Sequence, residues 1–549
     1  MKHLPATDRN WLMNVTGQTN RRHFLATTSA GLGGLLLPGG LRAAPNQPPA
    51  DNPLASLNLA WTDSIRWAHV VDVTQAAGVN VMEKIAHAQT QLAAQGGGVI
   101  YFPPGDYQLT ETIRLKDGMV LRGADPAVSR AQDEKFAPPS RLVFPKYVFS
   151  DQGDGTPLNT AFMGIELEDP AKASNCGVVN LDLDHGHIFF EEAAEHVCGR
   201  NRLVVGCRLR NAALPNREVP DLKIGQKPWQ RYTATWDRAA IQVFSAGNAL
   251  IASNGLPRSG EDNFTMNGCV LLDRAKKPVT VDGVVFDFDN RAGIYLNHYG
   301  IGGAGGGGPD GTPETHPHGF RKGLVIRDNY VFNTGRCAIG FCGDGVECRH
   351  NVIRFAKDVW RPTVTGRHLS HGASTNDNRA IEMRGWRWIV AGNDYEVHRN
   401  KCYDRVYYIN DGEGLMHEDH VNSTVKDSVL TNNRGNAYVS IYFVAGIDGL
   451  RVEGNEIRLP DSASGEPAIH VTANRVSGAF PCRNVRILNN TVSGRGILLN
   501  GSPAENNAIQ GNKAIGPTPQ KIRNQAQALV ENNEGFEVDT TPWEPRRKM

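Results

Sequence analysis

The sequence predicts an all-β fold in which short strands stack into a single parallel β-solenoid. Three observations support this prediction. The 549 residues include 59 Gly and 31 Pro, and only 40% are hydrophobic, a composition that favours many turns and short strands over long helices. One helix-like segment precedes a series of strand-like segments near the N-terminus. From about residue 174, a repeat of just over twenty residues places a polar turn between two short apolar stretches.

The helix-like segment is VNVMEKIAHAQTQLAAQ, residues 79–95, in which apolar residues recur at helical spacing. It runs into Gly96-Gly97-Gly98, which is typical of a helix end. The stretch VIYF, the turn PPGDY and two short strands separated by Asp117-Gly118 come next. The sequence therefore predicts one capping helix at about residues 80–95, followed by strands.

The repeat is aligned on one polar position in the turn of each coil. Stacked asparagine amides can hydrogen-bond the turns above and below and so satisfy buried backbone groups. Asparagine also tolerates the left-handed backbone that such a bend needs. A β-sandwich with recurrent asparagine turns is the alternative, but it does not require so regular a spacing. The aligned residues are Cys207, Cys269, Asn329, Asn351, Asn400, Asp427, Asn455, Asn490, Asn512 and Asn533.

The helix and the stretch QGGGVIYFPPGDYQLTETIRLKDGMVLRGA resemble the N-terminal cap and first coil of the pectate-lyase-like superfamily of right-handed parallel β-helices. The asparagine repeats are similar to its later coils, and the resemblance covers roughly residues 60–535. It implies a single-stranded right-handed parallel β-helix with an N-terminal capping helix. It does not imply one chemistry, because the superfamily includes polysaccharide lyases, glycoside hydrolases, epimerases and phage tailspikes.

The N-terminus predicts export. Arg21 and Arg22 precede Phe24, Leu25 and a glycine-rich apolar run, and this stretch resembles a twin-arginine signal that is later removed. We expect a periplasmic or extracellular protein without stable membrane insertion, because no other stretch reaches about 18 apolar residues. The expected organisation is a signal peptide at 1–44, a flexible lead-in at 45–60, the β-helix with its cap at 61–535 and a C-terminal tail at 536–549.

The charge balance restricts the possible partners. With 58 basic and 57 acidic residues the net charge is +1, so the chain has no global field that would hold nucleic acid.

The nine cysteines lack paired CxxC spacing. Because the twin-arginine route carries proteins that fold in the reducing cytoplasm, we expect free thiols packed as small hydrophobic groups. A zinc site is the alternative for the tightest group, Cys337, Cys342, Cys348 and His350.

In a solenoid, function collects on one lateral face and on the longer turns. Three stretches break the repeat and could wall a groove for a polysaccharide or oligosaccharide: residues 210–238, 299–321 and 357–379. Flat aromatic rings lie well on the apolar faces of sugars, so three tryptophans are predicted to contact substrate: Trp229, Trp236 and Trp360. Trp386 and Trp388 fit either the groove or the core.

The stretch NDGEGLMHEDH, residues 410–420, carries six ionisable side chains. If Asp411 and Glu413 lie on a strand, they share one face with a Cα separation of roughly 6.5–7 Å. The alternative is a solvated turn. The predicted catalytic residues are Asp411, Glu413, His417, Glu418 and His420. Other acidic or imidazole groups that could line the groove or belong to turns are Asp182, Asp184, His185, His187, Asp287, Asp289, Asp344 and Glu347.

Two chemistries fit this stretch. In hydrolysis of a glycoside, Asp411 and Glu413 would act as acid and as base or nucleophile. In β-elimination at a uronic acid, His417 or His420 would be the base, and a cation would neutralise the sugar carboxylate. Elimination is slightly favoured because an arginine group lies nearby in the sequence: Arg379, Arg384 and Arg387. Asp411 and Glu413 could also hold Ca²⁺. A non-catalytic glycan-binding β-helix is a third possibility.

Residues 378–457 are also similar to the catalytic coils of the chondroitinase B and alginate lyase group. Gly412 and Glu413 match the Gly-Glu pair of that group, which implies that Glu413 is a calcium ligand. His420 falls near the position of the lysine in that group. The position of its arginine falls in VSIYFVAG, which contains no basic residue. Apart from this calcium, the sequence indicates no cofactor.

Overall fold

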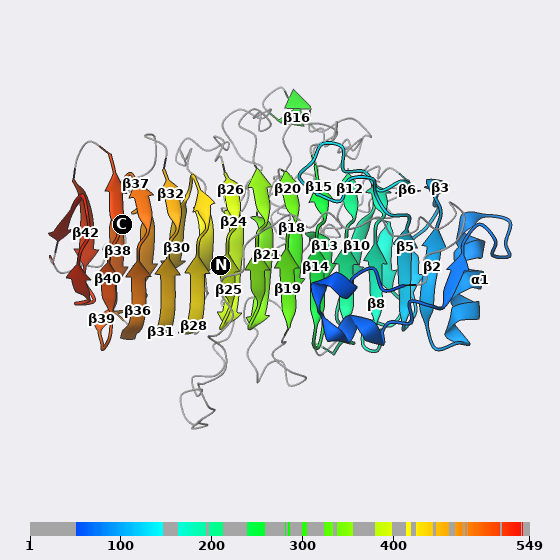
Figure 1. The fold of residues 1–549 in the computed structure, drawn as a ribbon, viewed down its shortest axis with the longest axis horizontal. Helices are drawn as coiled ribbons and strands as arrows, with labels where there is room; N and C mark the ends of the chain where they lie inside the picture. Colours follow the sequence, from blue (N-terminus) through cyan, green and yellow to red (C-terminus); the bar gives the residue numbers. More distant parts are fainter. Residues whose placement is uncertain are drawn as a thin grey trace. The chain divides into compact units, whose positions relative to one another are not determined.

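The computed structural model shows a right-handed parallel β-helix (Figure 1). Residues 48–549 form one compact unit. Among the described residues no helix has the length and apolar character needed to span a membrane. The structure describes residues 51–145, 163–193, 197–210, 212, 239–257, 280–281, 284–285, 299–304, 323–332, 337–354, 379–397, 413–418, 424–442, 446–459, 467–475, 478–479, 481–516, 519–539 and 541.

Each coil contributes one strand to each of three long parallel sheets, which we call sheets A, B and C in chain order. Sheet A consists of β1 (Val70–Asp72), β2 (Gly98–Phe102), β5 (Met119–Gly123), β8 (Cys176–Val179), β11 (Arg202–Val205), β14 (Ala249–Ala252), β19 (Leu324–Arg327), β22 (Glu347–Arg349), β25 (Ile389–Ala391), β28 (Thr424–Thr431), β31 (Gly446–Glu453), β36 (Pro481–Leu488), β39 (Ser502–Pro503), β40 (Ala508–Gln510) and β43 (Leu529–Glu531).

Sheet B follows sheet A in each coil after a short turn. Sheet B consists of β3 (Gly105–Gln108), β6 (Ser140–Val143), β9 (Asp182–Asp184), β12 (Arg208–Arg210), β15 (Gly255–Leu256), β20 (Tyr330–Phe332), β23 (Val352–Arg354), β26 (Asp394–Glu396), β29 (Arg434–Gly435), β32 (Glu456–Arg458), β37 (Thr491–Ser493) and β41 (Lys513–Ile515). The turns from sheet A to sheet B keep nearly the same length because the asparagine ladder described below runs through them.

Sheet C completes each coil. Sheet C consists of β4 (Ile113–Leu115), β7 (Gly164–Leu167), β10 (His187–Phe190), β13 (Ala239–Val243), β18 (Tyr299–Ala304), β21 (Cys337–Asp344), β24 (Arg379–Trp386), β27 (Glu413–Glu418), β30 (Tyr438–Tyr442), β33 (Ile469–Thr472), β38 (Ile497–Asn500), β42 (Gln520–Asn524) and β44 (Phe536–Asp539). Two antiparallel pairs lie outside the three sheets, β16 (Thr280–Val281) with β17 (Val284–Val285), and β34 (Asn474–Arg475) with β35 (Gly478–Ala479).

The core lies inside the coils, where apolar side chains of the same register position stack from one coil to the next. In sheet C, Ile241 pairs with Ile301, then Ile339 and Ile381 follow, and each of the four is fully buried. Residues two positions apart share a face of a strand, so the alternate positions point out of the coil. This alternation defines the inward and outward columns used below.

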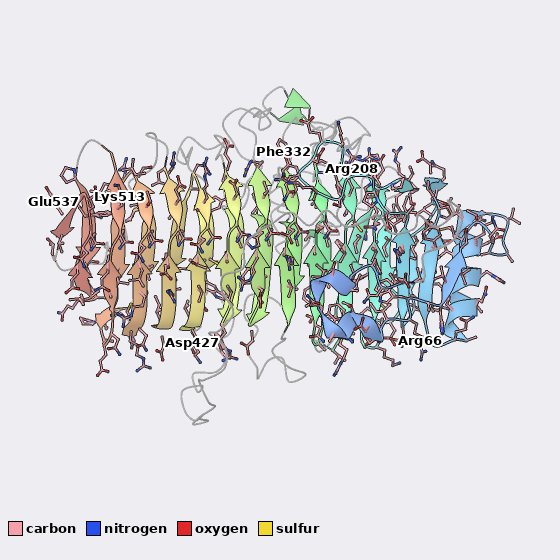
Figure 2. All side chains as sticks on the ribbon, in the orientation of Figure 1. Arg66, Arg208, Phe332, Asp427, Lys513 and Glu537 are labelled. Atoms are coloured by element: carbon pink, nitrogen blue, oxygen red, sulfur yellow. The ribbon has the colours of Figure 1, made fainter. Side chains whose placement is uncertain are left out.

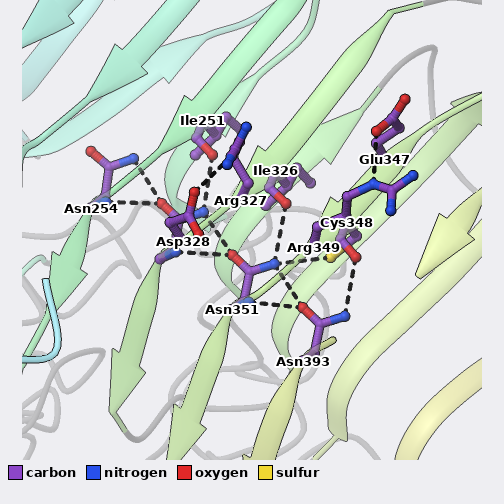
Figure 3. A network of polar contacts seen from close by, with 11 residues as sticks. Ile251, Asn254, Ile326, Arg327, Asp328, Glu347, Cys348, Arg349, Asn351 and Asn393 are labelled. Carbon is purple, nitrogen blue, oxygen red and sulfur yellow. Dashed lines mark hydrogen bonds and ion pairs between the residues drawn. The ribbon is translucent and has the colours of Figure 1, made fainter. Parts of the chain in front are cut away.

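An asparagine ladder runs through the turns between sheets A and B (Figure 3). The Nδ2 group of Asn351 donates to Asn393 Oδ1 at 2.9 Å and to the carbonyl of Ile326 at 3.1 Å. Its Oδ1 accepts from the backbone N of Asn329 at 3.1 Å and from its Nδ2 at 2.9 Å. The predicted stacking of asparagine amides is therefore confirmed. The described members are Asn254, Asn329, Asn351, Asn393, Asn433, Asn455, Asn490, Asn512 and Asn533.

One predicted member of the ladder is wrong, because Asn433 takes the place predicted for Asp427. Asn393 and Asn254 are members that the prediction omitted, and the predicted members Asn400 and Cys269 lie outside the described residues. The prediction for Cys207 holds, because its backbone N donates to Asn254 Oδ1 at 2.9 Å. The left-handed residue also precedes the ladder position rather than occupying it, as Asp328, His350 and Asn432 show with φ of 57°, 54° and 54°.

The capping helix is present as α1 (Val81–Ala93), in agreement with the prediction. Asn80 caps it by accepting from the backbone N of Glu83 at 2.9 Å, and Glu83 accepts in return from the backbone N of Val79 at 2.7 Å. The buried face of α1 consists of Ile85, Ala88, Gln89 and Leu92, and it covers the end of the core beside β2.

The chain before α1 differs from the flexible lead-in predicted for residues 45–60. It forms the 3-10 helices η1 (Ala55–Leu57) and η2 (Ala60–Ser64). Leu54, Ile65 and Trp67 are buried against an apolar patch on sheet A that is formed by Val99, Val120, Val179, Leu203, Val205, Leu250 and Ala252. Near the C-terminus, β44 extends the solenoid past residue 535, into the segment predicted as a tail.

The long insertions enter at two corners. The predicted insertion at 210–238 connects β12 to β13, and the one at 357–379 connects β23 to β24, so both lie between sheets B and C. The predicted insertion at 299–321 begins later than expected, because residues 299–304 form β18. Two of the insertions therefore end where strands of sheet C begin.

Candidate functional site

Strand β24 carries the clearest two-residue alternation of polar and apolar residues in sheet C. Ile381 and Met383 are fully buried members of the core. Glu382 therefore occupies an outward-facing position, and Arg384 and Trp386 occupy the next two outward positions along the strand. Glu382 is nevertheless only 2% exposed. Burying a carboxylate costs free energy of desolvation, so the charge must be compensated by its surroundings.

Strand β27 places the predicted catalytic stretch directly beside β24. Glu382 pairs with Met416, and Met383 pairs with His417, so Glu418 continues the outward column of Arg384. His417 falls in the column of Phe341, Met383 and Ile441, which are all buried in the core. By register, the position of His417 is thus an inward one and the position of Glu418 an outward one.

Polar residues recur in the outward columns of the next coils. Ser440 and His470 follow Glu382 and Met416 in one column, and Ser440 is 1% exposed. In the neighbouring column Thr472 pairs with Asn500, and both are buried. Among the described residues, the Thr472 hydroxyl and the Asn500 Nδ2 have no hydrogen-bond partner. Buried polar groups of this kind point to a bound water or to a ligand group.

At the end of β24 the chain turns into sheet A beside a group of charges. Asp344 forms an ion pair with Arg387, and the ring of Trp386 lies under the ammonium of Lys426 at 4.3 Å. Trp388 is fully buried, so of the two neighbouring tryptophans this one belongs to the core.

The other predicted site residues have different placements. Arg379 pairs with Glu413 at the start of β24 and β27, which places a basic position beside an acidic one. The remaining predicted catalytic and substrate-binding residues lie outside the described residues: Asp411, His420, Trp229, Trp236 and Trp360. The proposed calcium ligands Asp411 and Glu413 therefore remain a prediction. The part of the chain that the structure describes contains no group of three or more potential metal ligands.

A second charged cluster lies on the outward face of sheet B. Asp182 accepts from Arg210 Nη2 at 3.1 Å and from Arg208 Nη1 at 3.5 Å, and Asp184 pairs with Arg141. Burial raises the pKa of Asp182, and the attraction of Arg210, Arg208 and then Arg141 offsets part of that rise. Because acidic and basic positions alternate from coil to coil, these pairs are satisfied within the fold.

Asp182, Asp184, His185 and His187, which the sequence offered as groove or turn residues, do not share one face. The chain turns from sheet B into sheet C at His185, which has φ of 62°. His187 is instead fully buried in β10, where its Nε2 lies 3.1 Å from Glu166 Oε1. Of the other candidates, Glu347 pairs with Arg349 at 2.8 Å, and Asp287 and Asp289 lie outside the described residues.

The cysteines with described side chains agree with the prediction of free, packed thiols. Cys176, Cys198, Cys207, Cys348 and Cys482 are free and buried. Burial raises the pKa of Cys176 to about 11 and that of Cys207 to about 12, which keeps both protonated.

The alternative zinc site does not fit the placement of two of its members. Cys348 is buried in the core, where its sulfur accepts from Asn351 Nδ2 at 3.4 Å. His350 is exposed on the turn.

The sequence analysis did not predict Glu382 as a site residue, because it selected only the arginines of the same stretch. The signal was present in RAIEMRGW, where Ile381 and Met383 alternate with Glu382 and Arg384. Ser440, Thr472 and Asn500 carry no local signal, since only the pairing of coils brings them to the same face.

Comparison with known proteins identifies no family. No protein-family model and no curated protein matches the chain. Among solved structures, the chain is similar to PfbA, a surface adhesin of Streptococcus pneumoniae, at 15% identity and a TM-score of 0.40, covering 86% of this chain and 92% of that one.

Two further similar solved structures are those of enzymes. The chain is similar to the catalytic unit of a thermostable GH87 α-1,3-glucanase from Streptomyces thermodiastaticus, at 13% identity and a TM-score of 0.37, covering 87% of this chain and 71% of that one. It is also similar to the A-module of the Azotobacter vinelandii mannuronan C-5 epimerase AlgE6, at 12% identity and a TM-score of 0.32, covering 85% and 94%.

Proposed function

We propose that the protein is an exported enzyme that cleaves glycosidic bonds of a polysaccharide on the outward face of sheet C, at β24 and β27. The observation that supports this most is Glu382, a carboxylate that is 2% exposed on an outward-facing column. Buried ionisable groups cluster at functional sites, and the same outward face also carries buried polar atoms of Thr472 and Asn500 that have no hydrogen-bond partner among the described residues.

Hydrolysis is the chemistry that the described positions favour. Glu382 and the position of Glu418 are diagonal neighbours on adjacent strands, and such Cα atoms lie about 7–8 Å apart. Carboxyl groups on these positions can reach the spacing of roughly 5–9.5 Å that glycosidases use. The more buried carboxylic acid would protonate the leaving oxygen, and the other carboxylate would attack the anomeric carbon or activate a water molecule.

Elimination on a uronate-containing glycan is the second candidate, and the register of Arg384 favours it. Arg384 occupies the outward position next to Glu382, where a guanidinium would neutralise the sugar carboxylate. His420 would then be the base, since His417 falls in an inward column. Ca²⁺ bound to Asp411 and Glu413 would supply a second positive charge at the sugar carboxylate.

Incubation with a panel of neutral and uronate-containing polysaccharides tests the proposal. Reducing ends without unsaturated products indicate hydrolysis, and absorbance of unsaturated products indicates elimination. We expect Glu382→Gln to lower the rate roughly 10²–10⁴-fold, whereas Glu537→Gln, an exposed carboxylate on the last strand of the same sheet (Figure 2), leaves it unchanged. A folded Glu382→Gln protein with the wild-type rate, or a wild-type protein that binds glycans and releases no product, would contradict the proposal.

Export by the twin-arginine route belongs to the same proposal, because a polysaccharide is met outside the cytoplasm. Arg21 and Arg22 support it. Replacing both by lysine keeps the charge, so we expect the full-length protein to stay in the cytoplasm in a fractionation experiment. Unchanged export of the double variant would contradict this part.

A further inference from the structure

The outward positions of β24 end at Trp386, beside charges that the cleavage chemistry does not use. We call Asp344, Trp386, Arg387 and Lys426 the corner cluster. Trp386 pairs with Asp344 of β21, and Lys426 lies on the exposed side of β28. The backbone N of Arg387 donates to the carbonyl of Lys426 at 2.9 Å, which joins β28 to the corner. Trp386 lies four positions after Glu382, a distance of roughly 13 Å along a strand.

The acidic member of the corner cluster is buried while its basic members are exposed. Asp344 has a side chain that is 6% exposed, and one carboxylate oxygen, Oδ2, contacts Arg387. Its other oxygen, Oδ1, has no hydrogen-bond partner among the described residues. The Arg387 side chain stays 50% exposed, and Lys426 is also exposed. The exposed charged members of the corner cluster are therefore basic, with the exposed Asp427 as an acidic neighbour. An acceptor oxygen without a partner among the described residues lies beneath them.

The backbone of Arg387 gives an independent indication. Its φ is 51°, and the corresponding turn residues of other coils include Gly345 and Gly449, with φ of 71° and 89°. A long side chain in the left-handed region carries a cost of order 1 kcal/mol. The left-handed backbone disfavours an arginine at this position. Its presence is expected if the guanidinium charge has a role that offsets the backbone cost.

We propose that Trp386, Arg387 and Lys426 form a subsite for an acidic sugar unit of the glycan. The guanidinium and the ammonium would bond the carboxylate or sulfate of the sugar. The indole would pack against the apolar side of the sugar ring, and Asp344 Oδ1 would accept from a hydroxyl group. This inference rests on the proposed function, because the same glycan chain would extend along β24 to Glu382.

Asp427→Asn is a matched substitution that should change the affinity for acidic ligands in the opposite direction to Lys426→Gln. Asp427 follows Lys426 in β28, is exposed and has φ of 43° (Figure 2 labels it at the edge of sheet A). Asparagine occupies the corresponding left-handed positions at Asn484 and Asn506, so Asp427→Asn retains the backbone and removes one negative charge. Lys426→Gln removes one positive charge at the neighbouring residue.

The test measures the Kd of acidic hexasaccharides from polygalacturonate, alginate and chondroitin sulfate by calorimetry, with maltohexaose and cellohexaose as neutral controls. The Glu382→Gln background prevents cleavage during the titration. We expect Lys426→Gln to weaken binding of the best acidic ligand about five- to tenfold and Asp427→Asn to strengthen it about twofold. Neutral ligands should respond to neither change. Lys521→Gln, an exposed lysine on β42, is the control for total charge.

Two outcomes would overturn the subsite: acidic ligands that fail to bind at millimolar concentration, and affinities that Lys426→Gln leaves unchanged or alters equally for neutral and acidic ligands. The two proposals fail separately. If the variants shift the affinity for acidic ligands as expected while the wild-type protein releases no products, the subsite stands and the cleavage proposal falls. If the wild-type protein cleaves its substrate but the affinities do not respond to changes at Lys426 and Asp427, the cleavage proposal stands and the subsite proposal falls.

Discussion

Glu166 on β7 shows at the scale of one residue how neighbouring strands decide the state of a charge. Its side chain is 26% exposed, and its two oxygens lie 3.1 Å from His187 Nε2 and 2.9 Å from Arg114 Nη1. Burial alone would raise the pKa of Glu166. The hydrogen bond and charge of His187, and then those of Arg114, outweigh burial, so the pKa is lowered from its ordinary value of 4.5.

This lowered pKa makes the contribution of Glu166 to stability depend on pH. The contribution is present above the unfolded pKa and is lost as the pH falls through the lower folded pKa. We expect Glu166→Gln to reduce the free energy of unfolding by about 1–2 kcal/mol near neutral pH and by much less at about pH 3. Urea unfolding of both proteins at the two pH values measures this. Glu111→Gln, an exposed carboxylate, serves as the control, and an equal loss at both pH values would contradict the explanation.

At the scale of elements, the pairing of β26 with β29 shows how one coil makes room for the next. Tyr395 is buried, and its hydroxyl donates to the carbonyl of Ala437 at 2.9 Å. Its register partner is Gly435, where a Cβ would lie 2.0 Å from the Tyr395 ring. Position 435 requires glycine because the Tyr395 ring leaves no space for a Cβ atom, and not because its backbone has a positive φ.

We therefore expect Gly435→Ala to lower the free energy of unfolding by about 1–3 kcal/mol, because the tyrosine ring must shift. Gly247→Ala is the matched control, since a Cβ there meets nothing within 4 Å. In a double-mutant cycle, Tyr395→Leu should remove most of the cost of Gly435→Ala. Additive effects of the two substitutions would show that the ring does not cause the cost.

The asparagine ladder acts at the scale of the whole molecule, because it links coils that lie far apart in the sequence. Asn351 is fully buried and joins Asn329 to Asn393 across 22 and 42 residues. Removing its amide leaves the buried backbone N of Asn329 and the carbonyl of Ile326 without these hydrogen bonds. Asn533 at the end of the ladder is partly exposed, so water can replace the hydrogen bonds that it loses.

We expect Asn351→Ala to lower the free energy of unfolding by about 2–4 kcal/mol and Asn533→Ala by less than half as much. Thermal unfolding monitored by circular dichroism compares the two variants. Equal losses for the interior and the terminal member would show that burial does not set the strength of the ladder.

Local patterns predicted the fold because its signals are local. The end of α1, the polar turns and the two-residue alternation each depend on a few neighbouring residues. The same reasoning misassigned or omitted ladder members where insertions change the coil length. Asn393 and Asn400, or Asp427 and Asn433, are equally plausible in sequence. Only the hydrogen bonds between coils select Asn393 and Asn433.

The candidate site was predicted only in part for the same physical reason. The sequence indicated two stretches that lie side by side, since residues 379–386 and 413–418 form the adjacent strands β24 and β27. It could not decide which residues face outward. The irregular pairing between Glu413 and Leu415 of β27 and their partners in β30 shifts the register, and this type of shift follows from packing against the next coil.

By itself, the sequence determined that this chain builds a β-helix with a capping helix, because turn residues and the periodicity of apolar residues act within a single coil. The tertiary structure decided that Glu382 lies buried on the outer side of sheet C, in line with Arg384 and Trp386 and beside the position of Glu418. The physical reason is that strand register between coils depends on non-local packing, and the register selects which distant side chains share a face.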